Sequence, residues 1–513
     1  MKIKIITMLL VLCYSNYLLA QNSHAKHDNI WLMGTEDDNS DPFFGGTKID
    51  FTTEPATISD VSTNISFNRT NTTMSDTAGN LQFYTNGIRI MNAEGELMEN
   101  GDGLNPCYFS EPYEEVGLPL PQIVLALPYP NHPNWYVLIH EVPENYETID
   151  TYPENVLVYS LKYTLIDMAE NGGLGKVIAK NQTIFEDTLK MGGLTAVRHG
   201  NGRDWWIVLN EYGANCKYSM LLSPTGFTLP NRYCLGDNNN YWGVTQAVFS
   251  PDGSKYVQSN DSSVSIFDFD RCSGELSNPI ALSFDEYTAG IAIAPNSRYL
   301  YLSNYLTKLF QFDLYAPDIA ASKTLVAEYD GFQVGNMAHT FCFLQLAPDN
   351  KIYTCGIGSV VYLNVINQPN LQGVACDVQQ HSVPLFSYNN ATLPNHPNYR
   401  LGALPPERCA WAVGIQEASP QPPPKEGELQ NLLLVMPNPA SNNFVLHYQL
   451  PPHIAFGVIE LYNTLGQKVL YKQAPQALHQ INVSVADLAA GVYLYRFVTI
   501  EGQLASGKII VNQ

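Results

Sequence analysis

The stretch VTQAVFSPDGSKYVQSNDSSVSIFDFD, residues Val244–Asp270, shows the pattern on which most of the chain is built. An apolar run leads into the tight turn Ser250–Ser254, a second run follows, and Val264–Phe269 supplies a third. In such a turn, Pro presets the first dihedral angle, Asp bonds its own backbone, and Gly accepts a positive φ. The stretch therefore predicts short strands joined by tight hairpins.

Five further stretches share this pattern at intervals of roughly 45–70 residues, the size of a four-stranded propeller blade with its loops. They are Thr73–Met91, Ile123–His140, Leu194–Glu211, Gly290–Asp313 and Phe341–Val365. Radial repetition of small sheets also leaves few free edges that invite aggregation. The pattern predicts an all-β fold with a single β-propeller over residues 30–413, and it argues against a two-domain β-sandwich.

Two incomplete stretches, Asn29–Phe51 and Pro384–Val413, flank these six units. Each can supply part of one more blade, and we expect the ring to close by pairing the first strand with the last blade. This arrangement predicts seven blades, with six or eight as the alternatives.

The propeller region resembles the exported WD-repeat-like propellers of Bacteroidetes bacteria over most of residues 30–400. The likeness is carried by the segments Gly46–Phe51, Gly79–Gly87, Phe269–Leu276 and Leu344–Tyr353. It implies the propeller fold. That family has no common activity that the resemblance could transfer to this chain.

The C-terminal residues 431–513 have the pattern of a small immunoglobulin-like β-sandwich, with about seven short strands in some 80 residues. Four motifs stand in order there: Met436–Ser441, Tyr462–Val469, Leu488–Phe497 and Lys508–Val511. These motifs resemble the C-terminal sorting domain of the type IX secretion system. The resemblance implies handling by that machinery, removal after export, and a cargo that is released or attached to the cell surface. Residues 414–430 are Pro-rich and predict an extended linker.

The N-terminus has the order of a secretory signal peptide over residues 1–20. Lys2 and Lys4 precede an apolar run from Ile5 to Cys13, and Ala20 is a suitable residue before cleavage. The run is shorter than the ~20 residues needed to cross a bilayer. We therefore expect Sec export to the periplasm and a final location outside the cell or on the outer-membrane surface, without a transmembrane segment.

The composition is acidic, with 27 Lys and Arg against 48 Asp and Glu among 513 residues. Hydrophobic residues make up 45% of the chain and charged residues only 15%, which favours a well-packed core over disorder. Such an acidic surface repels nucleic acid, so no nucleic-acid partner is expected.

Eight cysteines remain once Cys13 is removed with the signal peptide, and an oxidising compartment permits disulfides. Cys342 and Cys355 flank a predicted turn, which favours a cross-strand pair. Further candidate pairs are Cys216 with Cys234 and Cys376 with Cys409. No CxxC spacing is present, so a zinc site is not expected.

Catalytic motifs are missing from the sequence: there is no GxSxG, no HExxH, no Walker loop and no GxGxxG after a strand. His24 and His27 form an HxxH pair in what we expect to be a disordered start. The acidic cluster Glu36, Asp37, Asp38 and Asp41 lacks calcium-loop spacing, and a solvated loop is the favoured interpretation. We predict no catalytic, cofactor-binding or metal-binding residues and no cofactor.

The pentapeptide Pro-Asn-His-Pro-Asn occurs twice, at Pro130–Asn134 and at Pro394–Asn398. We interpret both copies as turns rather than as a paired site of His132 and His396. The tryptophans could form a sugar-stacking surface, but packing between blades is the favoured interpretation; they are Trp135, Trp205, Trp206 and Trp242.

These observations predict a secreted or cell-surface propeller that works as a binding or scaffold protein, with a glycan or protein ligand that the sequence does not name. The alternative is a propeller hydrolase or lyase acting on extracellular polysaccharide or peptide. A third hypothesis is a calcium-dependent adhesin. Fold alone does not decide between them, since propellers host both binding and catalysis.

Overall fold

The computed structural model describes the propeller region and much of the tail. The described residues are 25–36, 41–145, 156–236, 246–260, 262–304, 307–409, 433–436, 440, 442–448, 450, 456–463, 468–475, 480–486, 488–499 and 502–512. The predicted signal peptide, residues 1–20, and the predicted linker, residues 414–430, lie outside them. The chain divides into two compact units, Met1–Gly414 and Ile415–Gln513, which we describe separately.

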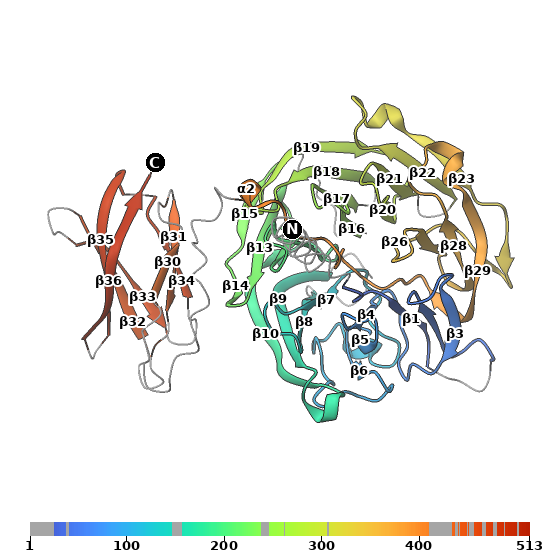
Figure 1. The fold of residues 1–513 in the computed structure, drawn as a ribbon, viewed down its shortest axis with the longest axis horizontal. Coiled ribbons are helices and arrows are strands. Elements are labelled where there is room, and N and C mark those ends of the chain that lie inside the picture. The colour runs from blue at the N-terminus through green and yellow to red at the C-terminus, as the bar shows by residue number, and fades with distance from the viewer. Residues whose placement is uncertain are drawn as a thin grey trace, which may run out of the picture. The chain divides into compact units, whose positions relative to one another are not determined.

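Among the described residues of the first unit, seven sheets of three to five strands follow one another along the chain and surround a common centre (Figure 1). The first two sheets have three strands each: β1 (Ile30–Gly34), β2 (Gly46–Asp50) and β3 (Thr57–Val61), then β4 (Thr72–Ser75), β5 (Leu81–Thr85) and β6 (Ile90–Asn92). The third sheet contains β7 (Val124–Pro128), β8 (Trp135–Asn145), β9 (Val156–Asp167) and β10 (Lys176–Leu189).

The fourth sheet is the widest, because two short strands both pair with its third strand. It contains β11 (Thr195–Arg198), β12 (Trp205–Asn210), β13 (Cys216–Ser223), β14 (Gly226–Phe227) and β15 (Asn231–Cys234). The fifth contains β16 (Gln246–Phe249), β17 (Lys255–Asn260), β18 (Ser263–Phe269) and β19 (Leu276–Ser283).

The last two sheets have four strands each. They contain β20 (Ile291–Ile293), β21 (Tyr299–Ser303), β22 (Lys308–Asp313) and β23 (Thr324–Glu328), then β26 (Leu344–Leu346), β27 (Ile352–Cys355), β28 (Ser359–Ile366) and β29 (Val378–Asn390). The hairpin of β24 (Gln333–Val334) and β25 (Met337–Ala338) lies between them in sequence. The helical turns are short: η1 (Glu111–Tyr113), η2 (Asn171–Gly173), η3 (Ala320–Ser322), η4 (Gly373–Cys376) and α2 (Pro406–Cys409).

Burial explains why inner strands such as β1 and β7 are apolar along most of their length. All five residues of β1 are buried, and so are the first four of β7, because each inner strand lies between neighbouring sheets and the ring centre. The fourth strands carry more polar residues: β10 is mostly half-buried or exposed. The predicted all-β propeller is confirmed, and the seven described sheets agree with seven blades.

The ring closes differently from the prediction. We expected the first strand to join the last blade, but β1 pairs with β2 in its own sheet, and β29 pairs with β28. With its thirteen residues, β29 completes the last sheet as a fourth strand, so no position is left for β1. Side-chain contacts make the closure: Thr47 Oγ1 lies 2.8 Å from Ser387 Oγ and accepts hydrogen bonds from the backbone N–H groups of Phe386 and Ser387.

After β29, the chain crosses the middle of the ring before it reaches α2 (Figure 1). We call residues Ala391–Pro405 the strap. Asn395 Nδ2 donates hydrogen bonds to the carbonyl oxygens of Val124 (2.9 Å) and Leu194 (3.0 Å), and the Tyr399 hydroxyl donates to Ala126 O at 2.8 Å. The strap therefore connects inner strands of different blades.

Residues Ala25–Asn29 lie against the strap. Arg400 forms a two-pronged ion pair with Asp28, with both N···O distances at 2.6 Å. His27 is 3% exposed, its Nδ1 lies 2.7 Å from Ser75 O, and its ring packs edge-on against Tyr399. The prediction that His27 belongs to a disordered start is therefore wrong, because this segment fills space between the strap and β4.

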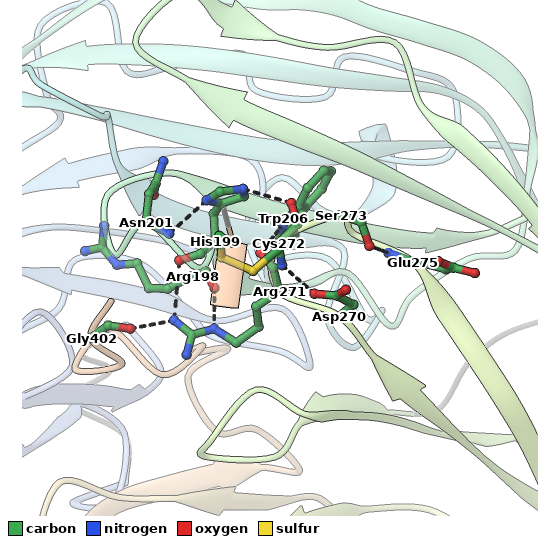
Figure 2. Close-up of a disulfide and its surroundings, with 11 residues drawn as sticks. Arg198, His199, Asn201, Trp206, Asp270, Arg271, Cys272, Ser273, Glu275 and Gly402 are labelled. Atoms are coloured by element: carbon green, nitrogen blue, oxygen red, sulfur yellow. Dashed lines mark hydrogen bonds between the residues drawn. A yellow bond between two sulfur atoms is a disulfide. The ribbon is translucent and has the colours of Figure 1, made fainter. Parts of the chain in front are cut away.

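Two disulfides are present among the described cysteines. The predicted Cys216–Cys234 bond is confirmed. The predicted pair of Cys376 and Cys409 is wrong: Cys409 bonds Cys272, which is 137 residues away in sequence, and Cys376 is a buried thiol in η4. Figure 2 shows the Cys272–Cys409 bond beside His199 and Arg271.

Cys342 and Cys355 are buried free thiols, so the predicted bond between them is also absent. The Cys342 N–H donates to Cys355 O at 2.8 Å, but the Cys355 N–H donates to Phe343 O at 3.2 Å. The two cysteines are thus neighbours in an offset register instead of a directly opposed pair.

The second unit has the predicted sandwich of two sheets. One sheet has the order β30 (Leu433–Met436), β31 (Asn443–Tyr448) and β34 (Gln480–Ser484), and the other β33 (Lys468–Pro475), β32 (Phe456–Tyr462), β35 (Gly491–Thr499) and β36 (Gly502–Val511). Alternate residues of β31, namely Phe444, Leu446 and Tyr448, point into the core and meet Ile459 and Phe497 of the other sheet. This alternation is typical of a sheet that covers a core on one face.

Candidate functional site

A cavity of about 540 Å³ lies at the centre of the first unit, among the inner strands and the strap. We call it the channel cavity. Its walls come from the inner strands and from three of the hairpin turns that the sequence singled out; the turn residues are Pro251, Asp252, Pro295, Asn296, Ser297, Pro348 and Asn350. On the remaining side it is lined by strap residues: His396, Pro397, Asn398, Arg400, Leu401 and Gly402.

Asp252 is one of two carboxylates that line the channel cavity. Its Oδ1 accepts hydrogen bonds from the Ser250 hydroxyl (2.6 Å) and from the backbone N–H and hydroxyl of Ser254 (both 2.9 Å). Burial opposes ionisation, but these hydrogen bonds outweigh it and lower the pKa of Asp252. The carboxylate is therefore an ionised part of its own turn, which confirms the predicted hairpin role.

Asp28 is the second lining carboxylate, and both of its oxygens already bind Arg400. Such a fork-to-fork arrangement satisfies both oxygens with charge-assisted hydrogen bonds. Asp28 is thus left without the free oxygen that a general acid or base needs, whereas the hydrogen bonds of Asp252 all reach Oδ1.

His396 lines the channel cavity from the strap. Its Nε2 lies 2.6 Å from Thr73 O and so donates a hydrogen bond to that carbonyl oxygen. Its Nδ1 is buried and has no hydrogen-bond partner. Burial lowers the pKa of His396, since the ring is cut off from water. The ring is therefore neutral at pH 7, with an acceptor nitrogen left over.

Arg271 fastens the end of the strap. Its guanidinium donates to Arg198 O at 2.8 Å, to His199 O at 3.3 Å and to Gly402 O at 2.5 Å (Figure 2). The neighbouring Cys272 then bonds Cys409. The β18–β19 turn thus holds the end of the strap by hydrogen bonds, and it holds α2, directly after the strap, by a covalent bond.

The other residues considered in the sequence do not converge on this cavity. Asp41 Oδ1 accepts from the Phe43 N–H at 2.9 Å, and Glu36 lies 4.0 Å from Arg89, whereas Asp37, Asp38 and His24 lie outside the described residues. In the parts of the chain that the structure describes, no group of three or more His, Cys, Asp or Glu side chains is placed to hold a metal ion.

Two of the described tryptophans pack in the core as predicted, whereas Trp135 is half-buried and stacks on a turn residue. Trp205 and Trp206 are buried, each against a different core cluster, and Trp242 lies outside the described residues. Trp135 stacks on His132 with ring centroids 4.3 Å apart, so the first Pro-Asn-His-Pro-Asn copy is the predicted turn. The second copy is not a turn: it is the buried part of the strap, and sequence reasoning missed it.

The tail matches a known family. Residues 434–512 match the family described as "Secretion system C-terminal sorting domain". The tail is a type IX sorting domain. Its presence implies export to the cell surface or secretion from the cell. No helix in the described ranges has the length and apolar character needed to cross a membrane.

A comparison with curated proteins finds no match. Similar solved structures include a putative 6-phosphogluconolactonase from Bacteroides uniformis, with 10% identity, a TM-score of 0.34, and 94% of this chain and 100% of that chain covered. Apo AztD from Citrobacter koseri has 11% identity and a TM-score of 0.35, with 71% and 97% covered. The Cps50 (Swd1) β-propeller domain of Myceliophteria thermophila has 11% identity and a TM-score of 0.33, with 61% and 88% covered. At these TM-scores the likenesses carry no argument about function.

Proposed function

We propose that the propeller is a binding or scaffold module displayed outside the cell, and that the channel cavity is its ligand site. The observation that carries this proposal is a cavity of about 540 Å³ whose two lining carboxylates are both held in structural contacts. A pocket of this size with scattered polar groups suits recognition of an extracellular glycan or peptide segment. Because both oxygens of Asp28 bind Arg400, the lining residues offer no pair of free carboxylates, which speaks against the alternative of an acid–base hydrolase or lyase.

We further propose the order of export. Residues 1–20 direct the chain to the periplasm, residues 30–413 fold as the propeller, and residues 414–430 connect it to the sorting domain of residues 431–513. Deleting residues 431–513 is expected to trap the propeller in the periplasm. Unchanged appearance of the truncated chain outside the cell would contradict this route.

Binding is tested with the purified whole chain on a glycan and peptide array. Pro348→Trp adds a bulky ring at the rim of the channel cavity, while Pro133→Trp makes the same change in an exposed turn that does not line the cavity. We expect Pro348→Trp to lose the array signal and Pro133→Trp to keep it. Equal signals from both variants would remove the channel cavity as the site, and release of cleaved product would support the hydrolase or lyase instead.

A further inference from the structure

A second cavity, of about 270 Å³, lies between the fourth and fifth sheets and shares no lining residue with the channel cavity. Two lysines line it, Lys190 and Lys217, and they are only 5% and 6% exposed. We call it the lysine cavity. Buried lysines are rare in proteins, since a charged ammonium group loses its hydration unless an anion or a set of acceptors replaces the water.

Lys217 bridges the two sheets. It belongs to β13, and its Nζ lies 4.2 Å from the centroid of the Phe267 ring on β18. No carboxylate among the described residues forms an ion pair with it. Burial, together with the positive charge of Lys190, lowers the pKa of Lys217 to about 7. At pH 7 the Lys217 amine is therefore only partly protonated, and a bound anion would favour its charged form by supplying the counter-charge that no described carboxylate provides in an ion pair.

The rest of the lysine cavity is rich in amides. Asn210, Gln258 and Asn260 line it, and Asn210 is the register partner of Lys217 across the β12–β13 pair. Asn210 Oδ1 and Asn260 Oδ1 are both buried without a hydrogen-bond partner. Unsatisfied amide oxygens beside a buried cation suit a ligand that carries hydroxyl donors as well as a negative charge.

We propose that the lysine cavity binds a small hydroxylated carboxylate of sugar-acid size. The carboxylate lies beside Lys217, with Lys190 adding positive potential, and the hydroxyl groups of the ligand donate to the asparagine oxygens. A cavity of about 270 Å³ is large enough for a single sugar ring or an open-chain sugar acid. This site is independent of the proposed channel-cavity ligand, because the two cavities are lined by different residues.

Isothermal titration calorimetry of the whole chain tests the proposal with four probes: D-glucuronate, D-gluconate, D-glucose and inorganic phosphate. We expect saturable binding of glucuronate or gluconate and none of glucose, which matches glucuronate in size but lacks the charge. Binding of none of the four probes would overturn the proposal, and so would binding of phosphate without either sugar acid.

Two variants locate the site. Lys217→Met keeps an unbranched side chain that is one atom shorter and removes the charge, and it is expected to weaken sugar-acid binding about ten-fold or more. Lys323→Met is the matched control, because Lys323 also lies over a phenylalanine ring, 4.0 Å from the Phe310 centroid, but is exposed at the surface. Equal affinity in both variants would overturn the assignment of the site.

Asn210→Asp gives a second test if Lys217→Met does not fold. The new carboxylate faces Lys217 across the strand pair and takes the place of the ligand's charge, so sugar-acid binding is expected to be lost while the protein stays folded. Retained binding in this variant would contradict the proposal. Loss of array binding in Pro348→Trp with unchanged sugar-acid binding would show that the two sites are separate.

Discussion

The pentapeptide Pro-Asn-His-Pro-Asn has two structures in this protein. At Pro130–Asn134 it is the turn between β7 and β8, with Asn131 exposed at a φ of 61° and His132 stacked on Trp135. At Pro394–Asn398 it is the buried strap, with Asn395 bonded to carbonyl oxygens of two blades. The first copy of the pentapeptide makes its contacts within the turn. In the second copy, Asn395 forms its hydrogen bonds with strands that are distant in sequence. The same five residues therefore contribute little to stability in one place and much in the other.

The largest loss in the free energy of unfolding is expected when the disulfide bond directly after the strap is removed. Replacing Cys272 and Cys409 by Ser opens a loop of 137 residues, for which chain entropy predicts a loss of about 5 kcal/mol in the free energy of unfolding. The same change at Cys216 and Cys234 opens a loop of 18 residues and is expected to cost about 3 kcal/mol. Urea unfolding of both double variants measures the difference. A smaller loss for the Cys272–Cys409 pair would mean that the strap does not depend on its anchor.

The next largest loss of stability is expected when the first asparagine of the pentapeptide is replaced in the strap, compared with the same replacement in the turn. Asn395→Ala removes three hydrogen bonds, to Val124 O, to Leu194 O and from Gln122 Nε2, which is expected to cost about 3 kcal/mol. Val124 O keeps the Thr72 hydroxyl as a donor. The matched change in the turn, Asn131→Ala, removes no buried hydrogen bond. Urea unfolding of the two variants gives the comparison, and equal losses would contradict the structural role assigned to the strap.

The pH dependence of stability separates the histidines. Burial lowers the pKa of His27 to about 4 and also lowers the pKa of His396, so folding favours the neutral rings. The unfolded chain takes up these protons first, because its histidines have a pKa near 6.5. Stability is thus full above about pH 6.5 and falls as the pH decreases toward 4, by about 3 kcal/mol for His27 alone.

Substitution tests this assignment. His27→Gln removes one titrating group and is expected to make the decrease in melting temperature between pH 6.5 and pH 4 smaller. Part of the decrease remains, because burial also lowers the pKa of His140 to about 3 and that of His339 to about 4. His132→Gln, in the exposed turn, serves as the control and should leave the wild-type profile unchanged. An unaltered profile in His27→Gln would show that another group governs the decrease.

The smallest change in stability is expected from substitutions in the Pro130–Asn134 turn. Asn131→Ala must place an alanine at a φ of 61°, which costs about 1 kcal/mol. Asn131→Gly is expected to be nearly neutral, since glycine adopts this conformation readily. Thermal unfolding distinguishes the two variants, and a loss in Asn131→Gly as large as in Asn131→Ala would mean that the asparagine side chain, not the backbone, stabilises the turn.

The same contrast explains what the sequence could predict. Strands and hairpins were predictable because their signals are local: Asp252 bonds the backbone of its own turn, and alternate residues of β31 enter one core. The strap was not predictable, because the partners of Asn395 lie about 270 and 200 residues away in sequence. The pairing of Cys272 with Cys409 and the burial of His27 depend on that path and were missed with it.

The candidate sites were still harder to predict. The channel cavity takes its walls from turns that the sequence singled out, but its closing side is the strap. Lys190 and Lys217 drew no attention in the sequence, since a lysine near a strand end is usually solvated. Only the packing of β13 against β18 reveals that Lys217 is buried.

The position of Cys409 matters for what happens downstream of it. It is the last described residue of the first unit, and the sorting domain begins after it in sequence. A proteolytic cut beyond Cys409 would leave α2 bonded to Cys272, so the last described segment of the first unit would stay attached to the β18–β19 turn. A force applied to the tail would reach the first unit at that disulfide bond before it reached the strap.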